Sequence, residues 1–329
     1  MLRRETDIEL RELRIFSAIS DSQTLTEAAK KLGVTQSAVS QALKILEEHL
    51  GAELLVRRTI PPVLTASGVA LKSYADEILA NVQQMKSAVR VASGEKLPEL
   101  RLGLIDSVAS SVARELLKKL DNRAEVISLK TGLTANLNRE FMDGKIDALI
   151  SSDVMAQVKG LELHPILRDP FVLIYSQSLL DSLPDPKAVD IQQLARNCPF
   201  IRYNRQSSIG NSTNVILRRM NIEVNDRFEF DSTQTLMNFV QAGDGWSLVT
   251  GLCLLQHPEL LEDVVVQPLG IVSARSLTLK ARAGELGDLP SEIAAHCRST
   301  FTNELLPKLV SISPWLEDQA IAIDELQLL

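Results

Sequence analysis

Residues 24–51 decide the fold of the N-terminal segment and read TLTEAAKKLGVTQSAVSQALKILEEHLG. Thr24 and Glu27 have the spacing of a capping box, in which each side chain satisfies a free backbone N–H of the first turn. This spacing predicts a helix that Thr24 caps. Gly33 follows its last apolar position, and glycine is the residue that most often ends a helix.

A further helix is predicted over residues 36–49, with Thr35 as its N-cap and Gly51 as its C-terminal stop. The apolar spacing upstream predicts a first helix over residues 7–20. Helices joined by so short a turn indicate a helix-turn-helix, whose second helix enters the major groove of DNA.

The two faces of this third helix differ in their chemistry. One face is an apolar stripe of Val39, Leu43, Leu46 and Leu50. The other face carries Gln36, Ser37, Ser40, Gln41 and Lys44. Hydroxyl and amide groups read base edges, so this face predicts a recognition surface. The alternative is the solvated face of an ordinary helical domain, and charge does not decide, because residues 1–60 carry as many acidic as basic side chains.

Two short β runs, residues 54–58 and 63–65, flank a turn that holds two prolines and predict a wing. Arg57 and Arg58 lie at its start, where contact with phosphates would position the protein without reading sequence. Solvent exposure is the alternative for Arg58.

Thr65 is expected to cap a long helix that reaches about Ala92. Its apolar positions are Leu71, Tyr74, Ile78, Val82, Met85 and Val89. At ~1.5 Å per residue the helix is about 40 Å long, and a continuous stripe of that length needs a covering partner. We expect a second copy of the chain, with residues 93–98 as a hinge.

From Leu100 the pattern changes to alternating strands and helices, which predicts a parallel sheet. One series ends at Ser151 and a comparable series restarts at Phe171. Two such series predict two lobes with a ligand cleft between them, beyond the carboxyl ends of the strands. The candidate ligand-binding residues at these strand ends are Ser107, Thr131, Thr134, Arg202, Tyr203, Asn204 and Thr250.

Ser107 precedes a helix, so free N–H groups are expected to point into the cleft. An arginine opposite them, Arg202, would suit a carboxylate or another anion. We therefore expect a small organic anion as the ligand; a solvated loop position for Arg202 is the alternative.

The net charge of −7 argues against a general nucleic-acid coat protein. No catalytic motif, phosphate loop or dinucleotide fingerprint is found, so we expect neither an enzyme nor a cofactor. The spacing of Cys198, Cys253 and Cys297 suits neither a zinc site nor a disulfide framework, and buried inert thiols are expected.

No apolar run approaches the ~20 residues that cross a bilayer, and the charged N-terminus leads into no apolar segment. These features predict a cytoplasmic protein with no membrane partner.

The N-terminal segment resembles the LysR family of transcription regulators. The resemblance is carried by Leu13, Phe16, residues 24–29, Leu32, residues 35–40, Leu46-Glu47, Leu50-Gly51, Leu54-Leu55, Arg57 and residues 64–68, and more weakly by residues 144–150, 169–171 and 240–246. Leu55 departs from the phenylalanine usual there. The resemblance implies that Gln36, Ser37, Ser40, Gln41 and Arg57 meet DNA, at an interrupted inverted repeat.

The resemblance also implies dimers, assembly into tetramers, a small-molecule effector and an influence on RNA polymerase. The expected architecture is a winged helix-turn-helix and linker helix, followed by a two-lobed α/β domain like that of periplasmic binding proteins. The expected boundaries are residues 1–65 for DNA binding, 66–97 for the linker, 98–168 with 270–310 for lobe I, 169–269 for lobe II and 311–329 for a C-terminal extension. A solute-binding protein, and a regulator that responds to a protein instead of a ligand, are the alternatives.

Overall fold

The computed structural model describes residues 8–56, 59, 61–93, 95–153, 155, 157–158, 160–185 and 189–323. The chain divides into two compact units, Met1–Val89 and Arg90–Leu329, and each is described by itself. No helix among the described residues is long and apolar enough to cross a membrane.

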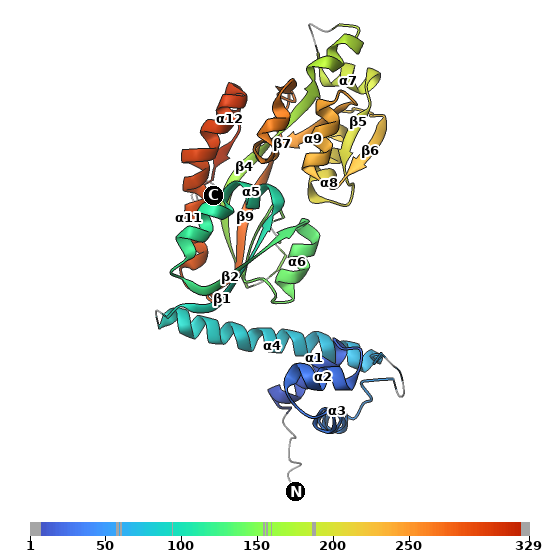
Figure 1. Cartoon of the computed structure of the whole chain (residues 1–329), viewed down its shortest axis with the longest axis vertical. Coiled ribbons are helices and arrows are strands. Elements are labelled where there is room, and N and C mark those ends of the chain that lie inside the picture. The colour runs from blue at the N-terminus through green and yellow to red at the C-terminus, as the bar shows by residue number, and fades with distance from the viewer. Residues whose placement is uncertain are drawn as a thin grey trace. The chain divides into compact units, whose positions relative to one another are not determined.

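The first unit is built on three helices, α1 (Leu10–Ser20), α2 (Leu25–Leu32) and α3 (Gln36–Leu50), which pack on one another (Figure 1). Thr24 accepts a hydrogen bond from the backbone N–H of Glu27, and Thr35 accepts one from Ala38. The Glu27 carboxylate reaches the backbone N–H of Gln23 instead of that of Thr24, so the capping box closes one residue earlier than predicted. The first helix begins at Leu10, and residue 7 lies outside the described residues.

Both predicted helix stops are glycines in the left-handed region, with φ of 67° at Gly33 and 64° at Gly51. The small side chains of Ala28 and Ala29 are buried against Ile15, Ile19 and Val39, which lets α2 approach its neighbours closely. This packing leaves the polar face of α3 exposed.

The wing is shorter than predicted among the described residues. A single antiparallel bridge joins Leu55 to Leu64, flanked by hydrogen bonds from Val56 to Val63 and from Thr65 to Leu54. Arg57 and Arg58 lie outside the described residues.

Helix α4 (Ala66–Ala92) has the predicted length. Ala75 is buried within the first unit, whereas the apolar side chains of Val69, Tyr74, Ile78, Met85 and Val89 are exposed. From Tyr74 to Val89 the predicted stripe is thus largely exposed in the single chain, whereas Leu71 packs against the cluster of Phe16, Leu46 and Leu54.

The second unit is built on a mixed sheet in the order β2-β1-β3-β9-β4-β7-β5-β6. Its strands are β1 (Leu97–Ile105), β2 (Ala124–Gly132), β3 (Ala148–Ser151), β4 (Leu161–Ser176), β5 (Phe200–Tyr203), β6 (Asp226–Phe230), β7 (Trp246–Thr250), β8 (Val264–Gln267), β9 (Ala274–Arg282) and β10 (Ile321–Ala322). The pairs β1–β2, β1–β3, β5–β6 and β5–β7 are parallel, as predicted. The prediction of a parallel sheet was wrong for other pairs, because β9 runs antiparallel to both β3 and β4, and β4 is antiparallel to β7.

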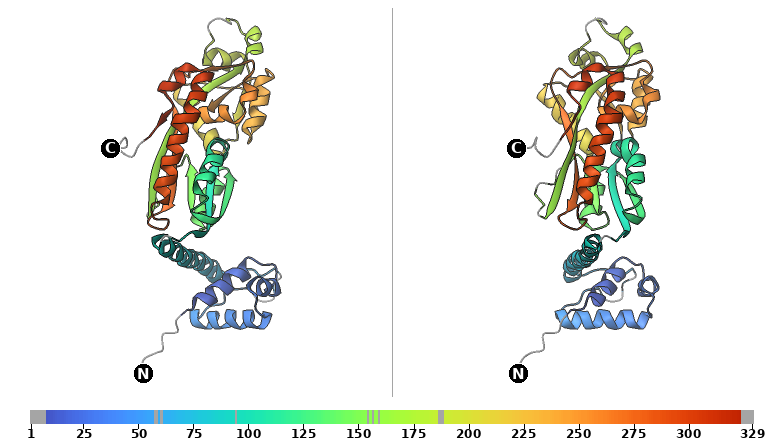
Figure 2. Two further views of the ribbon diagram at one scale, coloured as in Figure 1. Left: turned by 60° about the vertical axis from the view of Figure 1, so that its left-hand side comes forward. Right: turned by 90° about the vertical axis from the view of Figure 1, so that its left-hand side faces the viewer.

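The helices of this unit are α5 (Asp106–Leu120), α6 (Thr134–Met142), α7 (Ile191–Asn197), α8 (Ser208–Arg219), α9 (Thr233–Gln241), α10 (Gly251–Gln256), α11 (Leu289–Thr300) and α12 (Leu306–Ile312). Short 3₁₀ segments are η1 (Gln177–Ser182), η2 (Pro258–Leu261) and η4 (Pro314–Asp318), and a π turn, η3 (Phe301–Leu305), joins α11 to α12. Helices α5 and α11 pack on each other and on the lobe I strands (Figure 2).

Strand β4 connects the two lobes. Its first part, up to Pro170, pairs with β9, and from Phe171 it pairs with β7. The chain returns between β8, which pairs with β4 in lobe II, and β9 in lobe I. The two-lobed α/β fold is therefore confirmed, and the proposed lobe boundary at residues 168/169 lies beside the exchange of partners.

Residues 311–323, the described part of the C-terminal extension, pack onto lobe I. Strand β10 pairs with Arg168 and Leu167 of β4, and the Ile323 N–H donates to the Ile166 carbonyl. Leu316 is fully buried in the main core. This segment therefore covers an edge of β4 that would otherwise be open.

Replacement of Leu316 by alanine is expected to lower the free energy of unfolding by about 2–5 kcal/mol, because it leaves a cavity in the core. Urea unfolding followed by tryptophan fluorescence measures this, since Trp246 and Trp315 both lie in the second unit. The control is Val272→Ala, at a side chain that is 75% exposed, and its effect should stay within about 0.5 kcal/mol. Equal midpoints for the two variants would show that the segment adds no stability.

Candidate functional site

The first candidate site is the exposed face of α3. Thr35, Gln36, Ser37, Gln41 and Lys44 are exposed and Ser40 is half-buried, whereas Val39 and Leu46 on the opposite face are fully buried. Gln36 Nε2 lies 3.4 Å from Ser40 Oγ, and Lys44 pairs loosely with Glu48 at 3.6 Å. The predicted face is thus one continuous surface of hydroxyl and amide groups, and Arg57 lies outside the described residues.

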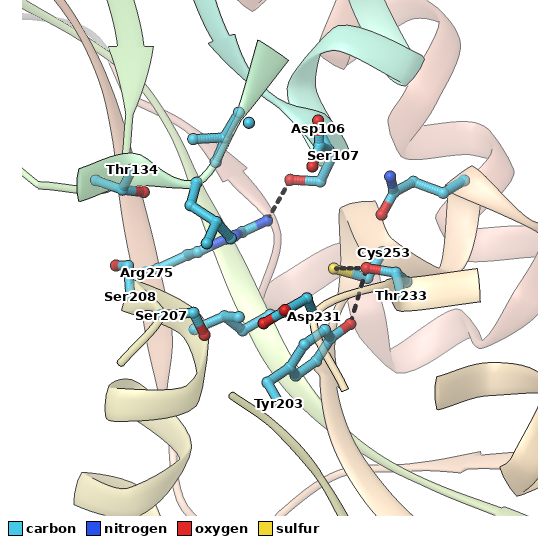
Figure 3. A pocket seen from close by; sticks show the side chains of 15 residues that line it. Asp106, Ser107, Thr134, Tyr203, Ser207, Ser208, Asp231, Thr233, Cys253 and Arg275 are labelled. Atoms are coloured by element: carbon cyan, nitrogen blue, oxygen red, sulfur yellow. Dashed lines mark hydrogen bonds between the residues drawn. The ribbon is translucent and has the colours of Figure 1, made fainter. Parts of the chain in front are cut away.

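The second candidate site is a small, partly open cavity in the second unit (Figure 3). Most of its lining residues end or follow β1, β2, β5 and β6, at the carboxyl ends of parallel strands in both lobes, and the others come from α10 and the start of β9. The lining residues are Ile105, Asp106, Ser107, Gly132, Leu133, Thr134, Tyr203, Ser207, Ser208, Ile209, Asp231, Thr233, Cys253, Gln256 and Arg275. Open α/β sheets bind ligands at this position.

The structure brings three of the predicted ligand residues together, Ser107, Thr134 and Tyr203, all of which line this cavity. Thr131 lies within β2, opposite Leu104, rather than after the strand. The Asn204 side chain accepts a hydrogen bond from the backbone N–H of Gln206 and shapes a turn. None of Thr131, Asn204 and Thr250 lines the cavity.

Arg202 is the clearest correction to the predicted site. Its side chain is 3% exposed and pairs with Asp226 and Asn214. It therefore does not line the cavity, and the anionic ligand that was inferred from it loses its cationic partner.

Arg275 is the guanidinium that does line the cavity, and it is already paired. Its Nε lies 2.9 Å from Asp169 Oδ2, and its Nη2 donates to Ser107 Oγ at 2.7 Å. Asp169 is 1% exposed, and its other oxygen accepts the backbone N–H of Leu252 in the first turn of α10 at 3.0 Å. This network joins β4, β9, α10 and α5.

A chain of hydroxyl groups forms the lobe II wall. Tyr203 donates to Thr233 at 3.0 Å, and Thr233 donates to the Cys253 thiol at 4.0 Å. Burial raises the pKa of Tyr203 well above its ordinary value, so the phenol stays neutral. Cys198, Cys253 and Cys297 are all buried thiols that form no disulfide with one another, and burial raises the pKa of Cys297 to about 12.

A buried lysine supports the cavity from lobe I. Lys280 on β9 donates to Ser151 and to the Asp153 carbonyl, and its side chain is fully buried. It thereby fixes the segment that follows β3. Ser152 of that segment lies 2.9 Å, Oγ to Oγ, from Ser208 of lobe II, a residue that lines the cavity.

Sequence reasoning missed Ser207, Ser208, Asp231, Thr233 and Arg275. The first four follow predicted strands, so the rule that selected Asn204 also applies to them. Arg275 lies at the start of an antiparallel strand, where the rule of carboxyl ends gives no signal. Among the described residues, no group of three or more His, Cys, Asp or Glu residues could hold a metal ion.

An exposed recognition-type helix in one unit and a two-lobed ligand domain in the other define a helix-turn-helix regulator with a sensor domain. Comparison with protein families agrees. Residues 10–69 match the model of the bacterial regulatory helix-turn-helix protein, lysR family, and residues 93–289 match the LysR substrate binding domain. The chain belongs to the LysR family: it is a DNA-binding transcription regulator and not an enzyme, which also decides against a solute-binding protein.

Among similar proteins is a probable RuBisCO transcriptional regulator of Thalassiosira pseudonana, 26% identical over 82% of this chain and 90% of the relative. A full-length CbnR complexed with its target DNA is 19% identical, with a TM-score of 0.60 over 89% of this chain and 100% of that one. LysG from Corynebacterium glutamicum with bound effector Arg is 19% identical, with a TM-score of 0.58 over 88% and 98%. These structures share the fold of this chain.

Replacement of Arg275 by methionine is expected to lower the free energy of unfolding by about 3–5 kcal/mol, because it leaves the Asp169 carboxylate buried without a counter-charge. Adding Asp169→Asn should recover part of that loss, which a double-mutant cycle in urea detects. Arg168→Met, at an exposed position of β4, serves as the control. Additive effects of the Asp169 and Arg275 substitutions would contradict a coupled pair.

Lys280 should make stability depend on pH. Burial lowers its pKa from 10.5 to about 8. Between these values the unfolded chain holds the proton and the folded protein does not, so the free energy of unfolding rises with pH. Relative to Lys280→Met, the wild type should gain roughly 1–3 kcal/mol from pH 8 to 10.5. Parallel stability curves of the two proteins in urea would contradict this assignment.

Proposed function

We propose that this protein binds an interrupted inverted repeat through α3 and that a small molecule in the lobe cavity controls this binding. The observation that carries the proposal is that one chain holds both features. Helix α3 has an exposed face of hydroxyl and amide groups, and the second unit has a cavity at the carboxyl ends of strands from two lobes. A bacterial DNA-binding regulator works where the DNA is, so the cytoplasmic location is part of the proposal.

The proposal includes a dimer in which α4 pairs with its copy. The exposed apolar side chains of α4, among them Tyr74, Met85 and Val89, favour this partner, because a continuous apolar stripe needs cover. Two copies related by a twofold axis would present two recognition helices to two half-sites. Tetramers, and an effect on access of RNA polymerase, are further parts of the proposal that rest on the family.

The ligand would act through the arrangement of the lobes. Lobe I and lobe II meet at the cavity through the Ser152–Ser208 contact and through Arg275 of lobe I, which bonds to Asp169 at the lobe crossing. A ligand shifts such an arrangement only as far as its affinity differs between the two states. The cavity touches both lobes, so that a change in their separation changes the contacts of the ligand.

Footprinting on the DNA upstream of the gene of this protein and its divergent neighbour tests the DNA-binding part. The Ser40→Ala/Gln41→Ala variant should protect its repeat at least about 10-fold more weakly, because each good contact to a base edge contributes about 1–3 kcal/mol of discrimination. Its binding to random DNA should be unchanged.

The control for this experiment is Glu77→Ala, an exposed position of the first unit on α4 rather than α3. It should protect the repeat like the wild type. Equal protection by the double variant and the control would remove α3 as the sequence reader.

A further inference from the structure

The charge of the lobe cavity points to a ligand of a definite class. Its charged lining side chains are Asp106, Asp231 and Arg275. Arg275 is 9% exposed and bonded to the buried Asp169 carboxylate, so its positive charge is balanced within the protein. The two aspartates that remain give the cavity an excess of negative charge.

Neither aspartate is balanced by a neighbour. Both are exposed, and within the described part of the chain neither carboxylate makes a hydrogen bond or ion pair. They come from different lobes, Asp106 from the start of α5 and Asp231 from the end of β6 (Figure 3). A ligand in the cavity therefore meets an unpaired carboxylate on each side.

The polar groups without charge add to this imbalance. The hydroxyl of Tyr203 donates to Thr233, that of Ser207 donates to the Asn204 carbonyl, and that of Ser208 is engaged with Ser152. These three hydroxyl groups of the wall are thus engaged within the protein. By contrast, the Oε1 atom of Gln256 is buried and has no hydrogen-bond partner. A buried polar atom left unpaired is unfavourable, so it calls for a donor.

We propose that the ligand of this cavity is a small molecule with a protonated amine, which Asp231 and Asp106 recognise. This inference rests on the proposed function, since it concerns the same cavity. An ammonium group supplies both what the cavity lacks, positive charge and hydrogen-bond donors, for two carboxylates and the Gln256 oxygen. A carboxylate on the same molecule would bind favourably at the starts of α5 and α6, where no side chain caps the helix.

The test uses the full-length protein and three probes that share one carbon chain and differ in charge: butylammonium, γ-aminobutanoate and butanoate. Their effect on Tm is measured at constant ionic strength near neutral pH, with and without Asp231→Asn. Butylammonium or γ-aminobutanoate should raise Tm in a saturable way and butanoate should not. Asp231→Asn should weaken the amine effect at least about 10-fold.

Asp121→Asn is the matched control, because Asp121 is also exposed but lies at the other end of α5 from the cavity. Its probe affinities should equal those of the wild type. Stabilisation by butanoate alone, an amine effect that survives Asp231→Asn, or no effect of any probe would each overturn the proposal.

Footprinting with the same preparations separates this proposal from the proposed function. An intact footprint together with preference for butanoate would leave a regulator of DNA with an anionic ligand. Loss of sequence-specific protection in the wild type would instead remove the proposed function, whatever the probes do.

Discussion

The second unit depends on one buried ion pair, Asp169 with Arg275. Asp169 lies where β4 passes from one lobe to the other, and its two oxygens hold different elements, the first turn of α10 and the guanidinium on β9. Arg275 continues the network to Ser107 at the start of α5. A buried carboxylate tolerates this position only while both partners are present, because desolvating an unpaired charge is costly. The lobe crossing, the α10 start and the cavity wall are therefore fixed by a single carboxylate.

The same pair decides the electrostatics of the cavity. An arginine at a ligand site is ordinarily a reason to expect an anion. Here the guanidinium is balanced from behind by Asp169, so the charge that a ligand meets is set by Asp106 and Asp231. Whether a lining side chain is paired within the protein therefore indicates the charge of the ligand better than its residue type does. The buried Lys280 shows the same principle, since it serves Ser151 and the Asp153 carbonyl rather than a ligand.

The sequence predicted local structure well wherever a local rule was sufficient. The caps at Thr24 and Thr35, the left-handed glycines 33 and 51, the extent of α4 and most strands follow from spacing and turn chemistry. Prediction from the sequence failed where a strand or side chain pairs with a residue that is distant in the chain. The antiparallel direction of β9, the inward turn of Arg202 to Asp226 and the pairing of Arg275 with Asp169, 106 residues earlier, are set by tertiary contacts. For the same reason the strand-end rule found three cavity residues but also selected Thr131 and Thr250, whose side chains are directed by neighbouring strands and by Cys253.

In the first unit, the low charge of the predicted DNA face limits how the protein can bind DNA. Its predicted DNA face is rich in hydroxyl and amide groups, and its one cation on α3, Lys44, has Glu48 beside it. Binding to DNA without sequence preference comes mainly from cationic contacts with phosphates, so this face alone provides little of it. Two such helices held at a fixed spacing would provide twice the base contacts of one. The exposed apolar side chains of α4 are suited to hold them, and on this argument the proposed dimer would be a condition for binding DNA rather than an addition to it.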